Sequence, residues 1–106
     1  MFTFVELPPF EELRDDLFGD DELGVLQRFL CDNPEAGAVI PGTGGCRKVR
    51  WAAKGKGKRG GARVIYFLLP GHEQIVLVAA YSKGERDDVP RTWLKRIKVG
   101  IDHEQG

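Results

Sequence analysis

The sequence is poor in the residues that build metal centres and disulfide scaffolds. Its 106 residues include two cysteines and two histidines, and neither Cys31 nor Cys46 has a CxxC partner or a histidine at zinc-site spacing. We therefore expect no metal and no cofactor. One disulfide between the two cysteines is conceivable, but we favour two buried free thiols in a reducing cytoplasm.

Long hydrophobic runs are also absent. The longest apolar runs, residues 64–69 and 75–81, are far shorter than the roughly 20 residues that span a bilayer. The first residues lack the basic and apolar regions of a secretory signal. These absences predict a cytoplasmic protein without membrane contact, and the length fits a single domain over residues 1–106.

Net charge is the third absence, because 16 basic and 16 acidic side chains cancel. Such a balance taken alone disfavours a nucleic-acid partner. The charges are nevertheless separated along the chain: residues 1–35 hold ten acidic and two basic side chains, residues 36–72 hold eight basic and no acidic ones, and residues 73–106 hold six of each. This separation indicates an anionic partner for the basic middle of the chain.

Hydrophobic periodicity predicts an α+β domain with the element order β-α-α-β-β-β-α. The predicted elements are a first strand ended by Pro8 and Pro9, a helical hairpin over residues 10–32, strands at 46–52, 62–69 and 74–81, and a last helix at 88–101. In the hairpin, Gly19 is expected at the C′ position of the first helix, Asp20 as the N-cap of the second, and Leu13 in the buried stripe. The acidic residues would form the solvated face of the hairpin. We expect a small antiparallel sheet with the helices against one side.

The segment with the least ordinary composition is KGKGKRGGAR, residues 54–63, which holds four glycines and five cations. Glycine lets a backbone approach phosphates closely, and Lys and Arg neutralise phosphate charge. The segment lacks the GxxxxGK[ST] order of a nucleotide P-loop. A flexible, solubilising hairpin loop is the alternative interpretation, but the cations continue into both flanking strands, which favours a binding surface.

Pairing of the strands 46–52 and 62–69 across this segment would bring Lys48, Arg50 and Arg63 close together. Strand alternation places Lys48 and Arg50 on one face and Arg47 on the other with Trp51. Of the two aromatic residues at this border, Trp51 is expected in the core. Tyr66 is a candidate to stack on an unpaired RNA base.

The sequence VIPGTGGCRKVRWAAKGKGKRGGARVIYFLL, followed by AAYSKGERDDV, resembles the HigB/RelE-like toxins of bacterial type II toxin–antitoxin modules, in the RelE/ParE superfamily. The shared motifs are Pro-Gly-Thr-Gly-Gly, Arg-Lys-x-Arg, Gly-Lys-Arg-Gly-Gly-x-Arg-x-Ile-Tyr and Tyr-Ser-Lys-x-Glu, in the order and spacing of that family. The resemblance implies a RelE-like, microbial-RNase-like fold. It also implies metal-independent cleavage of mRNA in the A site of the 70S ribosome, which inhibits translation.

The resemblance further implies roles for individual residues. Arg63 matches the family's strand arginine and would stabilise the phosphorane; Lys83 would act as phosphate clamp or acid, and Lys58 is the candidate for proton transfer. Some relatives carry a Tyr or His near the final helix, but here only His103 lies near the terminus, so the general base is unassigned. The candidates for RNA binding are Arg47, Lys48, Arg50, Lys54, Lys56, Arg59, Tyr66 and Arg86.

The resemblance also implies partners. A cognate antitoxin, expected to be a helix-turn-helix protein of the HigA type, would neutralise the toxin, and the toxin would reach operator DNA only through their complex. Two other functions remain open at this stage. One is a ParE-like toxin that inhibits gyrase on the same fold, and the other is an RNA-binding module without catalytic activity.

Overall fold

The computed structural model describes residues 2–52, 61–82 and 89–105. Its elements are β1 (Thr3–Glu6), α1 (Pro8–Leu17), α2 (Asp20–Asp32), β2 (Ala38–Val39), β3 (Arg47–Trp51), β4 (Ala62–Leu69), the 3-10 turn η1 (Pro70–His72), β5 (Gln74–Ser82) and α3 (Arg91–Gln105). The predicted α+β class is confirmed. The observed order contains one strand more than predicted, the two-residue β2. None of the described helices is long and apolar enough to cross a bilayer.

The described strands form one sheet in the order β1-β5-β4-β3-β2. β1 pairs with β5 in parallel, from Thr3 opposite Gln74 to Glu6 opposite Leu77, whereas the other neighbouring pairs are antiparallel. The prediction of an antiparallel sheet was therefore wrong, because the sheet is mixed. Parallel pairing needs a long connection between the strands, and α1 to β4 supply that connection.

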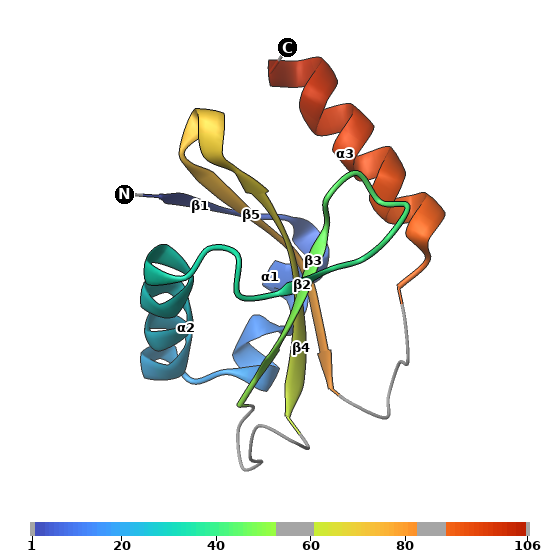
Figure 1. Cartoon of the computed structure of the whole chain (residues 1–106). Coiled ribbons are helices and arrows are strands. Elements are labelled where there is room, and N and C mark those ends of the chain that lie inside the picture. The colour runs from blue at the N-terminus through green and yellow to red at the C-terminus, as the bar shows by residue number, and fades with distance from the viewer. Residues whose placement is uncertain (1, 53–60, 83–88, 106) are drawn as a thin grey trace.

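The sheet is covered on both faces (Figure 1). On one face α1 and α2 pack Phe10, Leu26 and Leu30 against residues such as Tyr66 and Leu77. On the other face α3 contributes Leu94 to a cluster that includes Ile40, Cys46, Ile65, Phe67, Val76 and Val78. The prediction that the helices lie against one side was therefore wrong. Nearly every residue of β4 and β5 is buried, so each face of these strands needs its own cover.

The helical hairpin differs from its prediction at the ends of its helices. Gly19 follows Phe18, the C-cap of α1, and so occupies the predicted C′ position, although its φ is negative. Gly19 is also the N-cap of α2, so the N-cap role predicted for Asp20 was wrong. Pro8 begins α1, where a missing N–H costs nothing. Leu13 was expected in the core but is 40 % exposed. The acidic residues do lie on the solvent side, as predicted: Glu11, Glu12, Asp15, Asp16, Asp20, Asp21 and Asp32 are exposed.

A tight loop joins β2 to β3 and packs beside α3. The Thr43 hydroxyl is fully buried; it donates to the carbonyl of Ile40 at 2.6 Å and accepts from the backbone N–H of Cys46 at 3.0 Å. Gly44 has a φ of +79°, and a Cβ there would lie 2.8 Å from the Lys98 side chain. The loop therefore requires glycine at this position, and it closes one end of the cluster under α3.

Both cysteines are free thiols, as expected from the sequence, but only Cys46 is buried and Cys31 is partly exposed. Burial raises the pKa of the Cys46 thiol from 9.0 to about 12. The folded state holds the thiol proton more tightly than the unfolded state does. Protonation of Cys46 therefore contributes fully to stability below pH 9, and this contribution is lost as the pH rises toward 12.

We predict that the Cys46→Ala variant loses less stability than the parent protein in this alkaline range. The slope of unfolding free energy against pH should differ between the parent and the variant by up to about 1.4 kcal/mol per pH unit, which corresponds to the release of one proton. Urea unfolding at several pH values measures it. A Val78→Ala variant, which truncates a buried apolar residue on the same face, should be less stable at every pH but keep the parent's slope. Parallel curves for the parent and Cys46→Ala would contradict the prediction.

Candidate anion-binding site

The face of the sheet that α3 covers changes from apolar to cationic along β3 and β4. On β4, Leu69, Phe67 and Ile65 lie in the cluster with Leu94 of α3, and Arg63 is the next residue of the same face. Figure 1 shows α3 beside the loop between β2 and β3, with the end of β3 and the start of β4 at the opposite end of the molecule from the C-terminus of α3. The apolar part of this face is therefore packed, and the cationic part lies at the end of the sheet.

Three cations meet at this end of the sheet. Arg50 of β3 lies directly opposite Arg63 of β4, and Lys48 precedes Arg50 by two residues and so shares its face. We call Lys48, Arg50 and Arg63 the cationic cluster. Side chains directly opposite in an antiparallel pair have Cβ atoms about 4.5–5.5 Å apart, and like charges in such positions destabilise a sheet. On its other side, Arg63 lies opposite Tyr81 of β5.

Arg63 is buried, and no acid among the described residues compensates its charge. Its side chain is on the central strand, and the residue is 9 % exposed. Its Nη1 reaches the carbonyl of Ala62 at 3.5 Å, which is long for a hydrogen bond. Among the described residues, ion pairs join Arg14 to Glu6 and to Asp15, and Lys98 to Asp102, but none involves Arg63. A guanidinium removed from water costs several kcal/mol unless an anion compensates it, so this position is suited to an anionic ligand.

Arg47, another predicted RNA-binding residue, lies outside the cationic cluster. It is opposite Tyr66 and on the other face of the sheet, as strand alternation predicted. Its Nη1 donates to the carbonyl of Glu35 at 3.1 Å and to that of Gly37 at 2.8 Å. These contacts fasten the connection between α2 and β2 to the sheet, so Arg47 has a structural role here.

The prediction that Tyr66 stacks on an RNA base was wrong, because the side chain is fully buried. Its hydroxyl accepts from the backbone N–H of Gly37 at 3.0 Å and donates to the carbonyl of Pro34 at 2.8 Å. Burial raises the pKa of this phenol. A Cβ at Gly37 would lie 2.9 Å from the tyrosine ring, which explains the glycine. Strand alternation already places Tyr66 and Arg63, three residues apart, on opposite faces.

The expected core position of Trp51 is confirmed, since its ring centroid lies 5.0 Å from that of Phe29.

The other predicted site residues lie outside the described part of the chain: Lys54, Lys56, Lys58, Arg59, Lys83 and Arg86. In sequence they fall between β3 and β4 or directly after β5. β3 ends at Trp51, β4 begins at Ala62 and β5 ends at Ser82. In the sheet, Ala62 is paired with both Trp51 and Ser82. The cationic cluster therefore occupies the end of the sheet at which both of these segments join it.

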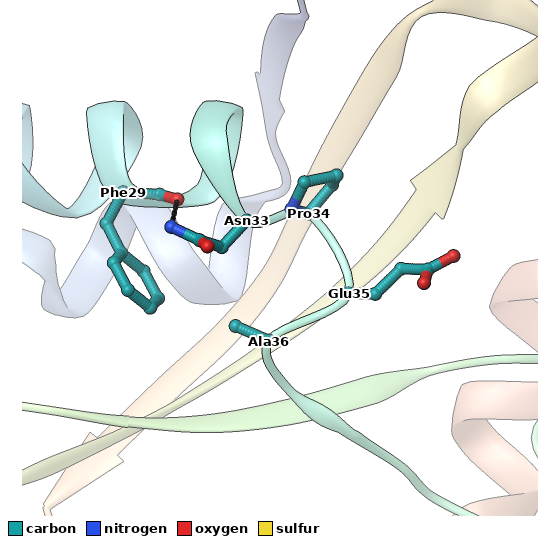
Figure 2. Close-up of a pocket in the computed structure, with 5 residues that line it drawn as sticks. All are labelled: Phe29, Asn33, Pro34, Glu35 and Ala36. Carbon is teal, nitrogen blue, oxygen red and sulfur yellow. Dashed lines mark hydrogen bonds between the residues drawn. The ribbon is translucent and has the colours of Figure 1, made fainter.

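A hollow of about 410 Å³ lies on another part of the molecule. It is lined by Phe29, Asn33, Pro34, Glu35 and Ala36, where α2 ends and the connection to β2 begins (Figure 2). The amide of Asn33 donates to the carbonyl of Phe29 at 3.2 Å. The one ionisable side chain of this lining is a carboxylate, so the hollow does not have the charge that an anionic ligand requires.

The described part of the chain contains no group of three His, Cys, Asp or Glu side chains placed to hold a metal ion. No protein-family model matches the chain. The function of the cationic cluster therefore has to be inferred from its own chemistry.

The Arg50–Arg63 repulsion makes a prediction about stability. Replacing Arg50 by Thr should stabilise the protein more than replacing Lys48 by Thr, because Lys48 faces Ile65 and not a second cation. Both changes put the same β-branched residue on the same strand and face. We expect a difference in unfolding free energy of about 0.5 kcal/mol, which shrinks as salt is added. Urea unfolding at low and high salt measures it, and equal stabilities for the two variants would refute the repulsion.

Proposed function

We propose that this chain is the toxin of a bacterial type II toxin–antitoxin module and acts as a ribosome-dependent mRNA endoribonuclease. The observation that supports this proposal most is the Arg50–Arg63 pair, in which a nearly buried guanidinium lies opposite a second one. Such an arrangement destabilises the free protein. A phosphate of RNA, placed between the two side chains, supplies the negative charge that compensates it.

The cleavage chemistry needs positive charge at this position. The 2′-hydroxyl oxygen attacks the neighbouring phosphorus as a base takes its proton, and the phosphorane that forms carries more negative charge than the starting diester. The bond to the 5′-oxygen then breaks, the leaving oxygen takes a proton, and a 2′,3′-cyclic phosphate remains. In this proposal the forked N–H donors of Arg63 and Arg50 bind the phosphorane oxygens. Guanidinium charge thus takes the role that a metal ion has in other nucleases.

The sequence suggests further catalytic residues and the partners of the protein. Lys83 and Lys58 stay candidates for phosphate clamping and proton transfer, and the general base is unassigned. The proposed partners are the 70S ribosome with its mRNA and a helix-turn-helix antitoxin in the cytoplasm. The antitoxin would inhibit either by covering the cationic cluster with acidic side chains or by blocking entry to the ribosome.

The direct test is cleavage of mRNA on translating ribosomes, with cut sites mapped by primer extension. The parent protein should cut in the A-site codon, and Arg63→Gln should lower the cleavage rate by about 10²–10³-fold, the loss expected for a donor to a developing oxyanion. The control is Arg28→Gln, because Arg28 is exposed on α2, which covers the opposite face of the sheet.

Three results would contradict the proposal. Cleavage by Arg63→Gln at the parent's rate would remove Arg63 from the site. Intact mRNA at saturating parent protein would leave an RNA-binding module without catalysis. DNA damage in cells that express the protein, without A-site cuts, would indicate the gyrase-inhibiting class.

A further inference from the structure

We propose that the cationic cluster binds two consecutive phosphates of an extended single-stranded RNA, with the scissile phosphate at the Arg50–Arg63 pair and its neighbour at Lys48. This inference rests on the function proposed above. It adds the path of the RNA, which runs along β3, and the number of phosphates that this part of the protein contacts.

The spacing of the cluster matches such a path. Lys48 and Arg50 are two residues apart on one face of β3, so their Cα atoms are separated by about 6–7 Å along the strand. That separation is close to the distance between consecutive phosphates in an extended nucleic-acid strand. Arg50 and Arg63 are closer to each other, at about 5 Å between Cβ atoms, and so converge on one phosphate. Lys48 faces Ile65 and offers a single point charge to the next phosphate.

The edge of the sheet leaves this path accessible. β2 covers β3 only at Arg47 and Lys48, where Val39 and Ala38 are the partners. Ala38 is exposed and presents a methyl group, which is too small to cover the lysine beside it. Arg50 has no partner on β2 and is itself exposed. RNA can therefore approach the cluster from the β2 side of the sheet.

Beyond Lys48, other parts of the protein cover this face of the sheet and block the RNA path. The next residue of β3's cationic face in the direction of Lys48 is Cys46, which is fully buried in the cluster with Ile40 and Leu94. The loop that contains Thr43 and the helix α3 cover the face from that point on. An RNA strand that follows β3 must therefore leave the sheet beyond Lys48, so the described residues of β3 and β4 contact two phosphates.

The test uses a trinucleotide with two phosphates, methylated at its 2′-hydroxyls so that it cannot be cleaved. Binding is measured by fluorescence anisotropy at low salt for the unmodified compound and for two versions with one linkage changed to a neutral methylphosphonate. For the parent protein, each neutral linkage should weaken binding about tenfold, the value of one charge-assisted hydrogen bond. Lys48→Gln should weaken binding of the unmodified compound to the same extent.

The effect of each neutral linkage on the affinity of each variant shows which side chain contacts which phosphate. Lys48→Gln should become insensitive to one linkage, because it has lost the partner of that phosphate, while Arg50→Gln should lose part of its sensitivity to the other linkage, whose phosphate Arg63 still contacts. The matched control is Lys95→Gln, which removes an exposed lysine of α3 and should keep the parent's affinity and both sensitivities. Loss of one phosphate contact should also reduce the slope of log affinity against log salt by about 0.7.

The two-phosphate path is overturned if Lys48→Gln keeps both sensitivities, if Lys48 and Arg50 act on the same linkage, or if the parent protein does not bind the trinucleotide at low salt. These failures are separate from failure of the proposed function. A parent protein that binds the trinucleotide in the expected pattern but cuts no mRNA on ribosomes would be a binding module with this path. One that cuts mRNA without the pattern would be a nuclease with another path.

Discussion

Arg63 places a positive charge on the central strand of the sheet, where the residue is 9 % exposed and lies directly opposite Arg50. A position of this kind is normally apolar, because burial of an uncompensated charge costs several kcal/mol. None of the described residues supplies an acid to Arg63 at one end of β4, while the rest of that strand packs in two apolar clusters. The apolar packing that stabilises β4 thus lies away from the site. The described residues of the site carry positive charge that an anionic ligand would neutralise.

The two-sided cover of the sheet explains how a chain without net charge presents a cationic surface. α1 and α2 lie on one face and turn their acidic residues to solvent. The cationic cluster lies on the other face, beyond the apolar residues that α3 covers. The acidic side chains of α1 and α2 and the cationic cluster thus lie on different sides of the sheet. Opposite charges on separate faces do not cancel for a ligand that contacts one of them, because salt screens the distant charges.

Much of this arrangement could be predicted from the sequence, because local patterns determine it. The run 62–69 coincides with β4, and alternation correctly separated Arg47 from Lys48 and Arg50. What was missed depends on partners distant in sequence. The parallel pairing of β1 and the position of α3 follow from which face each buried strand has left uncovered. Tyr66 was misjudged because it borders the basic patch and its neighbours Ile65 and Phe67 can fill the opposite face, whereas helices cover both faces of β4. The lysine-rich segment 53–60 lies outside the described residues, so its predicted roles stay predictions.

The central claim, that Arg50 and Arg63 together form an anion site, is tested most directly by nuclear magnetic resonance. The side-chain Nε–H signals of the arginines are followed as inorganic phosphate is added to ¹⁵N-labelled protein at low salt. Our account predicts that the signals of Arg50 and Arg63 shift together, with one dissociation constant, while that of Arg28 on the opposite face stays in place. Signals of Arg50 and Arg63 that do not move, or that move no more than that of Arg28, would contradict it.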